Sequence, residues 1–128
     1  MLSVESYIEK AKECQNFIYN HRMGVPYIYG DSTFYAIKQN AMDCLFNGCK
    51  AILTQHKIPV SVNRDEAIQY VRTNHEIGCL VSTALKCLSE WEYNTLNRND
   101  NFAEMWLHDL IYRLQDYCVY LQTNIANR

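Results

Sequence analysis

The C-terminal part of the sequence carries the longest uninterrupted pattern of hydrophobic and polar positions. Between Asn101 and Asn127, apolar residues recur at steps of three and four, which places them on one face of an α-helix. At about 1.5 Å per residue such a helix is roughly 40 Å long, the span of a small domain. It cannot bury this face alone, so the pattern predicts that other helices cover it. The predicted inward residues are Ala103, Leu107, Leu110, Leu114, Tyr117, Leu121 and Ile125.

The same periodicity predicts three more long helices and one short helix upstream. They are expected at residues 4–20, from 31 or 32 to about 57, at 64–72, and from a bend at 72–74 to the polar run 94–100. Residues 58–62 interrupt the pattern at Pro59, because proline disfavours the helical conformation of the residue before it. Together these segments predict an all-α fold, an antiparallel bundle of four long helices plus one short helix, in a single domain covering residues 1–128.

Polar side chains at the predicted helix starts are typical of N-caps. Ser3 is expected to cap the first helix and Asp31 or Ser32 the second. Three later starts show the spacing of a capping box, in which the cap residue precedes a glutamate by three positions. These pairs are Asn63 with Glu66, Thr73 with Glu76, and Asn101 with Glu104.

Glycine and proline positions complete the outline of the fold. Gly24 is expected to end the first helix in a left-handed cap conformation, and residues 25–30 to lie against the bundle as an extended apolar loop. Gly48 lies on the apolar face of the second helix, where glycine costs about 1 kcal/mol relative to alanine. Its position predicts a close helix crossing.

Composition and charge disfavour several classes of protein, including nucleic-acid-binding, membrane-spanning and secreted proteins. The 128 residues are 48% hydrophobic and carry a net charge of −2 with intermixed signs, which disfavours unspecific nucleic-acid binding. No apolar run approaches the roughly 20 residues that span a bilayer, and the N-terminus does not resemble a secretion signal, so we expect a cytoplasmic protein. Six cysteines without a CxxC pair lie on or beside apolar helix faces, which favours reduced core thiols over disulfides or zinc.

No group of residues forms a recognisable catalytic or metal site, and no cofactor is expected. The densest polar cluster is Arg72, His75 and Glu76, where histidine as acid or base and arginine as oxyanion partner would suit RNA cleavage. A solvated capping turn explains the same residues and is the favoured interpretation. The sequence contains no nucleophile motif and no phosphate-binding glycine loop.

Aromatic residues are the stronger signal. Ten tyrosines suit half-buried helix seams and protein interfaces, since each ring can be buried while its hydroxyl remains hydrogen-bonded. Tyr27, Tyr29 and Tyr93 are expected to be exposed, and Arg98 lies close to Tyr93 in sequence. These four residues, with Arg72, His75 and Glu76, are the candidate interaction residues.

The middle and end of the chain resemble the HEPN superfamily, small bundles of four or five helices found in toxins, antitoxins and nucleotidyltransferase partner proteins. The resemblance covers about two-thirds of the chain. It rests on residues 41–58 with the step Lys50-Ala51 before a leucine, on Pro59 followed by a short helix, and on the segment from Tyr93 to Arg98 before a long last helix. Catalytic HEPN ribonucleases carry an arginine followed after four to six residues by a histidine, a spacing absent here. The resemblance therefore implies a non-catalytic member, and no functional residues are carried over.

The sequence thus favours a non-enzymatic helical interaction protein, of the antitoxin, inhibitor or phage-type modulator class, acting through another protein or as a homodimer formed by a helix face. An RNA-cleaving or nucleotide-handling enzyme using Arg72, His75 and Glu76 is the alternative. A small-ligand pocket lined by tyrosines is a third possibility.

Overall fold

The computed structural model describes residues 2–22 and 27–126, and these residues are folded into helices without any strand. The predicted all-helical class is therefore confirmed. The elements are α1 (Val4–Asn20), α2 (Ser32–Gln55), α3 (Arg64–Asn74), α4 (Gly78–Leu96), α5 (Asp100–Tyr120) and a terminal π-helical turn, η1 (Leu121–Ile125). The expected glycine cap at Gly24, the Val25-Pro26 part of the loop and the helix end at Asn127 lie outside the described residues.

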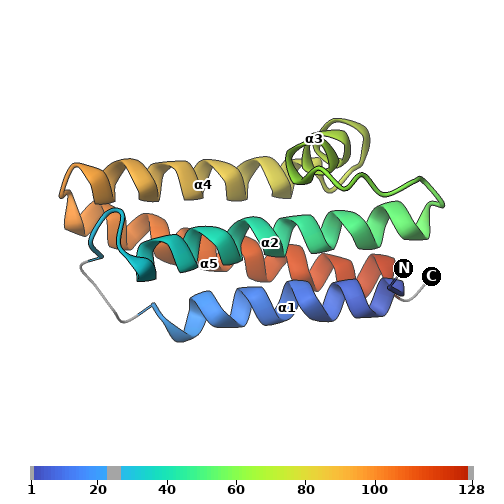
Figure 1. Cartoon of the computed structure of the whole chain (residues 1–128), viewed down its shortest axis with the longest axis horizontal. Helices are drawn as coiled ribbons and strands as arrows, with labels where there is room; N and C mark the ends of the chain where they lie inside the picture. The colour runs from blue at the N-terminus through green and yellow to red at the C-terminus, as the bar shows by residue number, and fades with distance from the viewer. Residues whose placement is uncertain (1, 23–26, 127–128) are drawn as a thin grey trace.

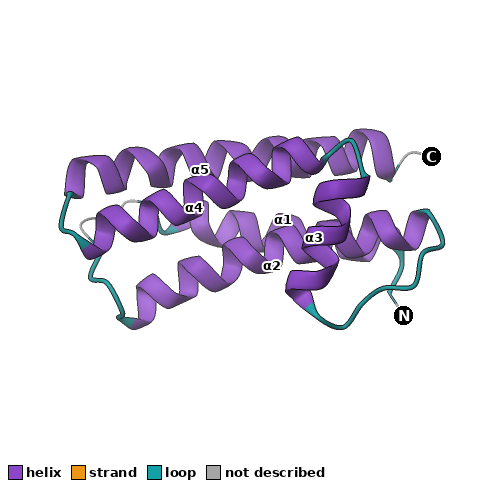
Figure 2. Cartoon of the chain, turned by 90° about the horizontal axis from the view of Figure 1, so that it is seen from above, coloured by secondary structure: helices purple, strands orange, loops and turns teal. Residues whose placement is uncertain are grey.

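The four long helices α1, α2, α4 and α5 lie along the long axis of the molecule, whereas α3 lies across it (Figures 1 and 2). One end of the molecule brings together the loop before α2, the start of α2, the end of α4 and the start of α5. The opposite end contains the end of α2, all of α3, the start of α4 and the end of α5 (Figure 1). Side chains that are far apart in sequence therefore meet at both ends.

Three of the predicted caps are present. Ser3 Oγ accepts from the Ser6 N–H at 3.1 Å, Asp31 Oδ1 from the Phe34 N–H at 2.8 Å, and Asn63 Oδ1 from the Glu66 N–H at 2.9 Å. Each bond satisfies one of the backbone donors that a helix start leaves without a partner inside the helix.

The other two predicted helix starts are wrong. Thr73 lies inside α3, and its hydroxyl donates to the Gln69 carbonyl at 3.0 Å instead of capping a new helix. Asn101 lies inside α5, which begins at Asp100. At Thr73 a side chain able to cap instead continues the preceding helix, whereas at Asn101 the helix starts two residues earlier than predicted, with Asn99 in the cap position.

The junction between α3 and α4 depends on Gly78. Its N–H donates to the His75 carbonyl at 2.9 Å, and a Cβ at this position would overlap the backbone carbonyl of Arg72. The close approach of the two backbones turns the chain sharply, so α4 begins later than the predicted bend at residues 72–74.

The last helix changes form near its end. The Ala126 N–H donates to the Leu121 carbonyl at 3.0 Å, a bond across five residues that widens the turn. All seven predicted inward residues of this segment are buried, including Leu121 and Ile125 within the wide turn. The pattern located the buried face correctly, while the prediction of one continuous α-helix was wrong.

The core runs along the whole bundle and contains the predicted close approach at Gly48. The ring of Tyr117 from α5 covers Gly48 on α2, and its hydroxyl donates to the Leu45 carbonyl at 2.7 Å. All six cysteines are free, and four of them are buried as expected for core thiols, whereas Cys14 is half-buried and Cys79 is exposed. Of the helices in the described part of the chain, none has the length and apolar character needed to cross a membrane.

Candidate functional site

A stack of aromatic rings supports one end of the molecule. Trp91 on α4 is fully buried, and its ring stacks on Phe34 of α2 with the centroids 4.9 Å apart. Tyr27 meets the edge of Trp91 at 5.8 Å, and Tyr29 lies 4.6 Å from Phe34. Aromatic pairs at these distances stabilise beyond the area they bury, so the stack helps to hold the loop before α2, α2 and α4 together.

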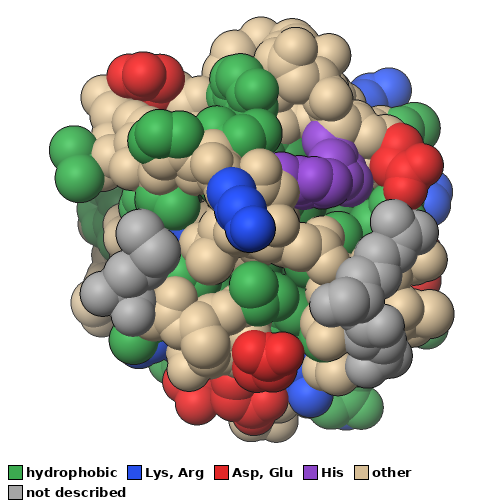
Figure 3. Space-filling model, turned by 90° about the vertical axis from the view of Figure 1, so that its right-hand side faces the viewer, with side chains coloured by type: hydrophobic (Ala, Val, Ile, Leu, Met, Phe, Trp, Pro, Cys, Tyr) green, Lys and Arg blue, Asp and Glu red, His purple; other side chains and the backbone are tan. Residues whose placement is uncertain are grey.

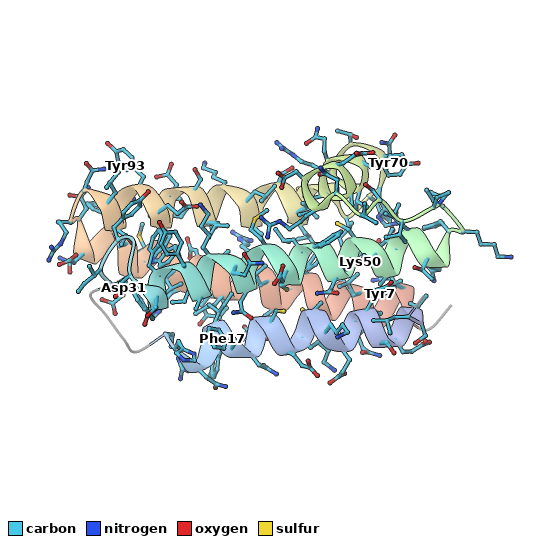
Figure 4. All side chains as sticks on the ribbon, viewed as in Figure 1. Tyr7, Phe17, Asp31, Lys50, Tyr70 and Tyr93 are labelled. Atoms are coloured by element: carbon cyan, nitrogen blue, oxygen red, sulfur yellow. The ribbon has the colours of Figure 1, made fainter. Side chains whose placement is uncertain are left out.

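Large apolar side chains are exposed at the same end of the molecule as this stack. We name Ile28, Tyr29, Tyr35, Tyr93 and Leu96 the aromatic end. Their exposed fractions run from 44% for Tyr29 to 62% for Tyr93. Figure 4 shows Tyr93 at the same end as Asp31, the cap of α2, and Tyr70 at the opposite end. The salt bridge between Lys38 and Glu92, at 3.1 Å, ties α2 to α4 below this surface.

The structure places two predicted interaction residues, Tyr29 and Tyr93, in the aromatic end. Arg98 lies nearby, exposed in the turn between α4 and α5, where its backbone takes a left-handed conformation with φ of 58°. The expectation that Tyr27 is exposed is wrong. Its side chain is buried against Trp91, and its hydroxyl donates to the His21 carbonyl.

Sequence reasoning missed Ile28, Tyr35 and Leu96. Ile28 lies in a loop and Leu96 on the last turn of a helix, so helical periodicity gives no signal for them, whereas Tyr35 falls outside the inward positions Phe34 and Ile37 of its helix. Leu96 is the clearest case, because it follows the buried residues Asn94 and Thr95 on the last turn of α4.

The polar cluster Arg72, His75 and Glu76 lies at the opposite end, and its members take different partners. Arg72 Nε donates to Ser82 Oγ at 2.8 Å, the Ile77 N–H donates to His75 Nδ1 at 3.1 Å, and Glu76 accepts from the Tyr120 hydroxyl. Arg72 is thus held toward α4, whereas Glu76 is held toward α5. A site for RNA cleavage would require the guanidinium, the imidazole and the carboxylate to converge on one phosphate. These contacts do not bring the three groups together.

His75 instead faces a histidine that the sequence did not single out for this site. The rings of His56 and His75 lie 5.4 Å apart, and the Tyr120 ring lies 6.4 Å from His75. Figure 3 shows histidine side chains as one patch on this end of the molecule, with an acidic side chain nearby. Both histidines lie at helix C-caps. The sequence predicted a helix start at residues 72–74, so it gave no signal for this contact.

A cavity of about 310 Å³ opens beside the two histidines. Its floor is apolar, formed by side chains from the end of α2 and from α3, and polar groups line its mouth. The lining residues are Ile52, Leu53, His56, Ile58, Tyr70, Val71, Asn74 and His75. A space of this size with a few polar groups fits a small molecule or one nucleotide base.

The buried thiols and Tyr117 belong to the core and offer no chemistry. Cys44 and Cys118 lie with their sulfurs 3.8 Å apart, and this contact together with burial holds the pKa of Cys44 well above its ordinary value. Burial also raises the pKa of Cys49 to about 12, partly offset by its contact with Tyr117. Thiols that remain protonated are poor nucleophiles and poor metal ligands. Among the described residues, no three histidine, cysteine or acidic side chains are grouped so that they would hold a metal ion.

No protein-family model, curated protein or solved structure matches this chain.

Proposed function

We propose that this protein is a non-enzymatic helical interaction protein that binds another protein through the aromatic end. The observation that carries the proposal is the exposure of Tyr29, Tyr35 and Tyr93 at the end of the molecule that holds the aromatic stack. Apolar side chains gathered on a surface are typical of binding sites, and tyrosine is enriched in the residues that dominate binding energy. A surface that is already rigid loses little conformational entropy when a partner binds.

The proposal includes the wider expectations drawn from the sequence. The four long helices form an antiparallel bundle crossed by α3, and the protein acts in the cytoplasm as an antitoxin, an inhibitor or a modulator of host machinery. Its relation to non-catalytic HEPN bundles is part of the same proposal and rests on the sequence resemblance alone.

Affinity capture from the native host tests the proposal. The tagged chain is expected to retain a specific protein partner, and the Tyr29→Ser/Tyr93→Ser variant to lose it. Tyr70→Ser is the matched control, because Tyr70 is as exposed as Tyr29, at 44%, but lies at the other end. Equal capture by wild type and by the Tyr29→Ser/Tyr93→Ser variant, both folded by circular dichroism, would exclude the aromatic end as the binding surface.

A second candidate function is RNA cleavage at the histidine pair, favoured by the contact of His56 with His75 beside the cavity. Two imidazoles, one as base and one as acid, supply the two proton transfers of phosphodiester cleavage. Purified protein is then expected to cleave single-stranded RNA, and His56→Ala and His75→Ala each to abolish cleavage. His108→Ala, which removes an exposed histidine on α5, is the control. Wild-type protein that leaves RNA intact removes this candidate.

A further inference from the structure

Gln15 is a polar residue at a core position of α1. It lies at steps of four and three from Ala11 and Ile18, on the face that α1 turns toward the core, and only 6% of it is exposed. Within the described part of the chain, its amide nitrogen Nε2 is shut off from water and has no hydrogen-bond partner. A buried donor without a partner destabilises a fold, so packing alone does not account for a glutamine here.

The Gln15 side chain lines a hollow of about 460 Å³ between α1 and α5. Three more carboxamides border the same hollow, Asn16 from α1 and Gln115 and Gln122 from α5. None of these three side chains forms a hydrogen bond with another described residue. The hollow is therefore surrounded by amide groups whose hydrogen-bonding capacity the described residues do not use.

The rest of the lining is apolar or already paired. Cys118 and Val119 supply apolar surface. Of the described residues that line the hollow, only Lys12 is charged, and its Nζ lies 3.6 Å from Glu9 Oε2. A cationic ligand would find no carboxylate in this lining, and an anionic one would compete with Glu9 for Lys12. Removing an uncompensated charge from water is unfavourable, so the hollow suits an uncharged molecule.

We propose that this hollow binds a small uncharged molecule through a carboxamide-like edge, in which an N–H donor and a C=O acceptor lie side by side. A glutamine amide presents the same pair of groups, so the two edges can form two parallel hydrogen bonds, as glutamine does with the edge of adenine. The last torsion of a glutamine side chain is broad, so the Gln15 amide can turn toward such a ligand. The volume suits one planar ring that carries this edge.

Titration with two small probes, followed by NMR, tests the ligand class. Nicotinamide carries the edge in a side group, and uracil carries it within its ring. At least one of them is expected to bind with a dissociation constant of about 1 mM, as is usual for so small a molecule, and to shift the side-chain NH₂ signals of Gln15 and Gln115.

Nicotinate, in which a carboxylate replaces the carboxamide of nicotinamide, is the matched control and is expected to leave these signals unchanged. Wild-type protein that binds neither probe, as a hollow holding only water would behave, overturns the proposal. Binding of nicotinate as tightly as nicotinamide also overturns it, because the edge would then not be what the hollow recognises.

Gln15→Met tests the buried amide, because methionine has nearly the same shape without the amide group. The variant is expected to unfold at higher urea concentration than wild type, since it removes the unpartnered donor, and to bind the probe about tenfold more weakly. Gln69→Met, on the exposed side of α3, is the control and should change neither property.

A Gln15→Met variant that is less stable than wild type would show that the amide already has a partner inside the protein. Unchanged probe binding by this variant would show that the probe lies elsewhere, and either result overturns the proposal. The hollow lies between α1 and α5, outside the aromatic end, so Gln15→Met is expected to retain any protein captured there. That retention distinguishes failure of this site from failure of the proposed function.

Discussion

Gly48 shows how a single missing side chain sets the distance between two helices. Glycine inside α2 is unfavourable for the helix itself, yet it leaves the space that the Tyr117 ring fills. The ring is completely buried, and the hydroxyl reaches the Leu45 carbonyl. A buried hydroxyl without a partner is costly, so the pair of residues secures both packing and hydrogen bonding.

Gly48→Ala is therefore expected to destabilise the protein, although alanine is the better helix former. The added methyl group overlaps the Tyr117 ring, and overpacking of a core typically costs about 1–3 kcal/mol. Urea denaturation measures the change in the free energy of unfolding. In a Tyr117→Leu background the same substitution should cost less, and an equal cost in both backgrounds would contradict the proposed contact.

The raised pKa values in the core predict loss of stability at alkaline pH. Burial raises the pKa of Cys49 from about 9 to about 12, and it raises the pKa of Tyr117 well above its ordinary value. The unfolded chain loses these protons above about pH 9 for the thiol and about pH 10 for the phenol, while the folded chain keeps them, so the free energy of unfolding falls as pH rises from 9 toward 12. Each group contributes at most about 1.4 kcal/mol per pH unit.

Denaturation at pH 8, 9 and 10 measures this slope. Cys49→Ala should lower stability at every pH but make the alkaline slope shallower, because one titrating group is gone. Cys79→Ala removes an exposed thiol and is the control. A slope that Cys49→Ala leaves unchanged would argue against this origin of the alkaline sensitivity.

At the scale of the elements, periodicity predicted the number, order and buried faces of the helices but not all of their ends. Buried faces depend on many residues, so one misplaced residue changes little. Ends depend on a single cap or contact. The end of α2 illustrates this. The helix stops at Gln55, Lys57 adopts a left-handed conformation with φ of 58°, and the Ile58 N–H donates to the Leu53 carbonyl at 2.9 Å.

The wide turn η1 depends on a contact with another element, which no local pattern contains. Gln55 Nε2, at the end of α2, donates to the Ile125 carbonyl at 2.6 Å. Gln55→Ala is expected to speed amide hydrogen exchange in residues 121–125 by an amount corresponding to about 1 kcal/mol, with exchange in α2 unchanged. Gln122→Ala, an exposed change within the same turn, is the control. Unaltered exchange in η1 would show that other contacts hold this turn.

At the scale of the whole molecule, the candidate sites depend on which element ends meet. Tyr29 and Tyr93 were predicted as exposed residues from sequence, but their common end follows only from the positions of the loop, α2 and α4. His75 was recognised as part of a polar cluster, whereas its contact with His56 requires α3 to cross the end of α2. Tyr27 was predicted to be exposed because the residues around it have the composition of a loop. In the structure its ring packs against Trp91 in the core.

Contacts that connect both ends of the bundle predict cooperative unfolding of the described helices as one domain. Tyr117 joins α5 to the middle of α2, Gln55 joins α2 to η1, and the stack on Trp91 joins α4 to the other end of α2. Tryptophan fluorescence measured in a Trp106→Phe variant, which leaves Trp91 as its one tryptophan, reports the aromatic end, whereas circular dichroism reports all helices. The two signals are expected to change at the same urea concentration, as in two-state unfolding. Fluorescence that changes at lower urea than helicity would show that the aromatic end melts separately, and it would then lack the rigidity on which its proposed role in binding depends.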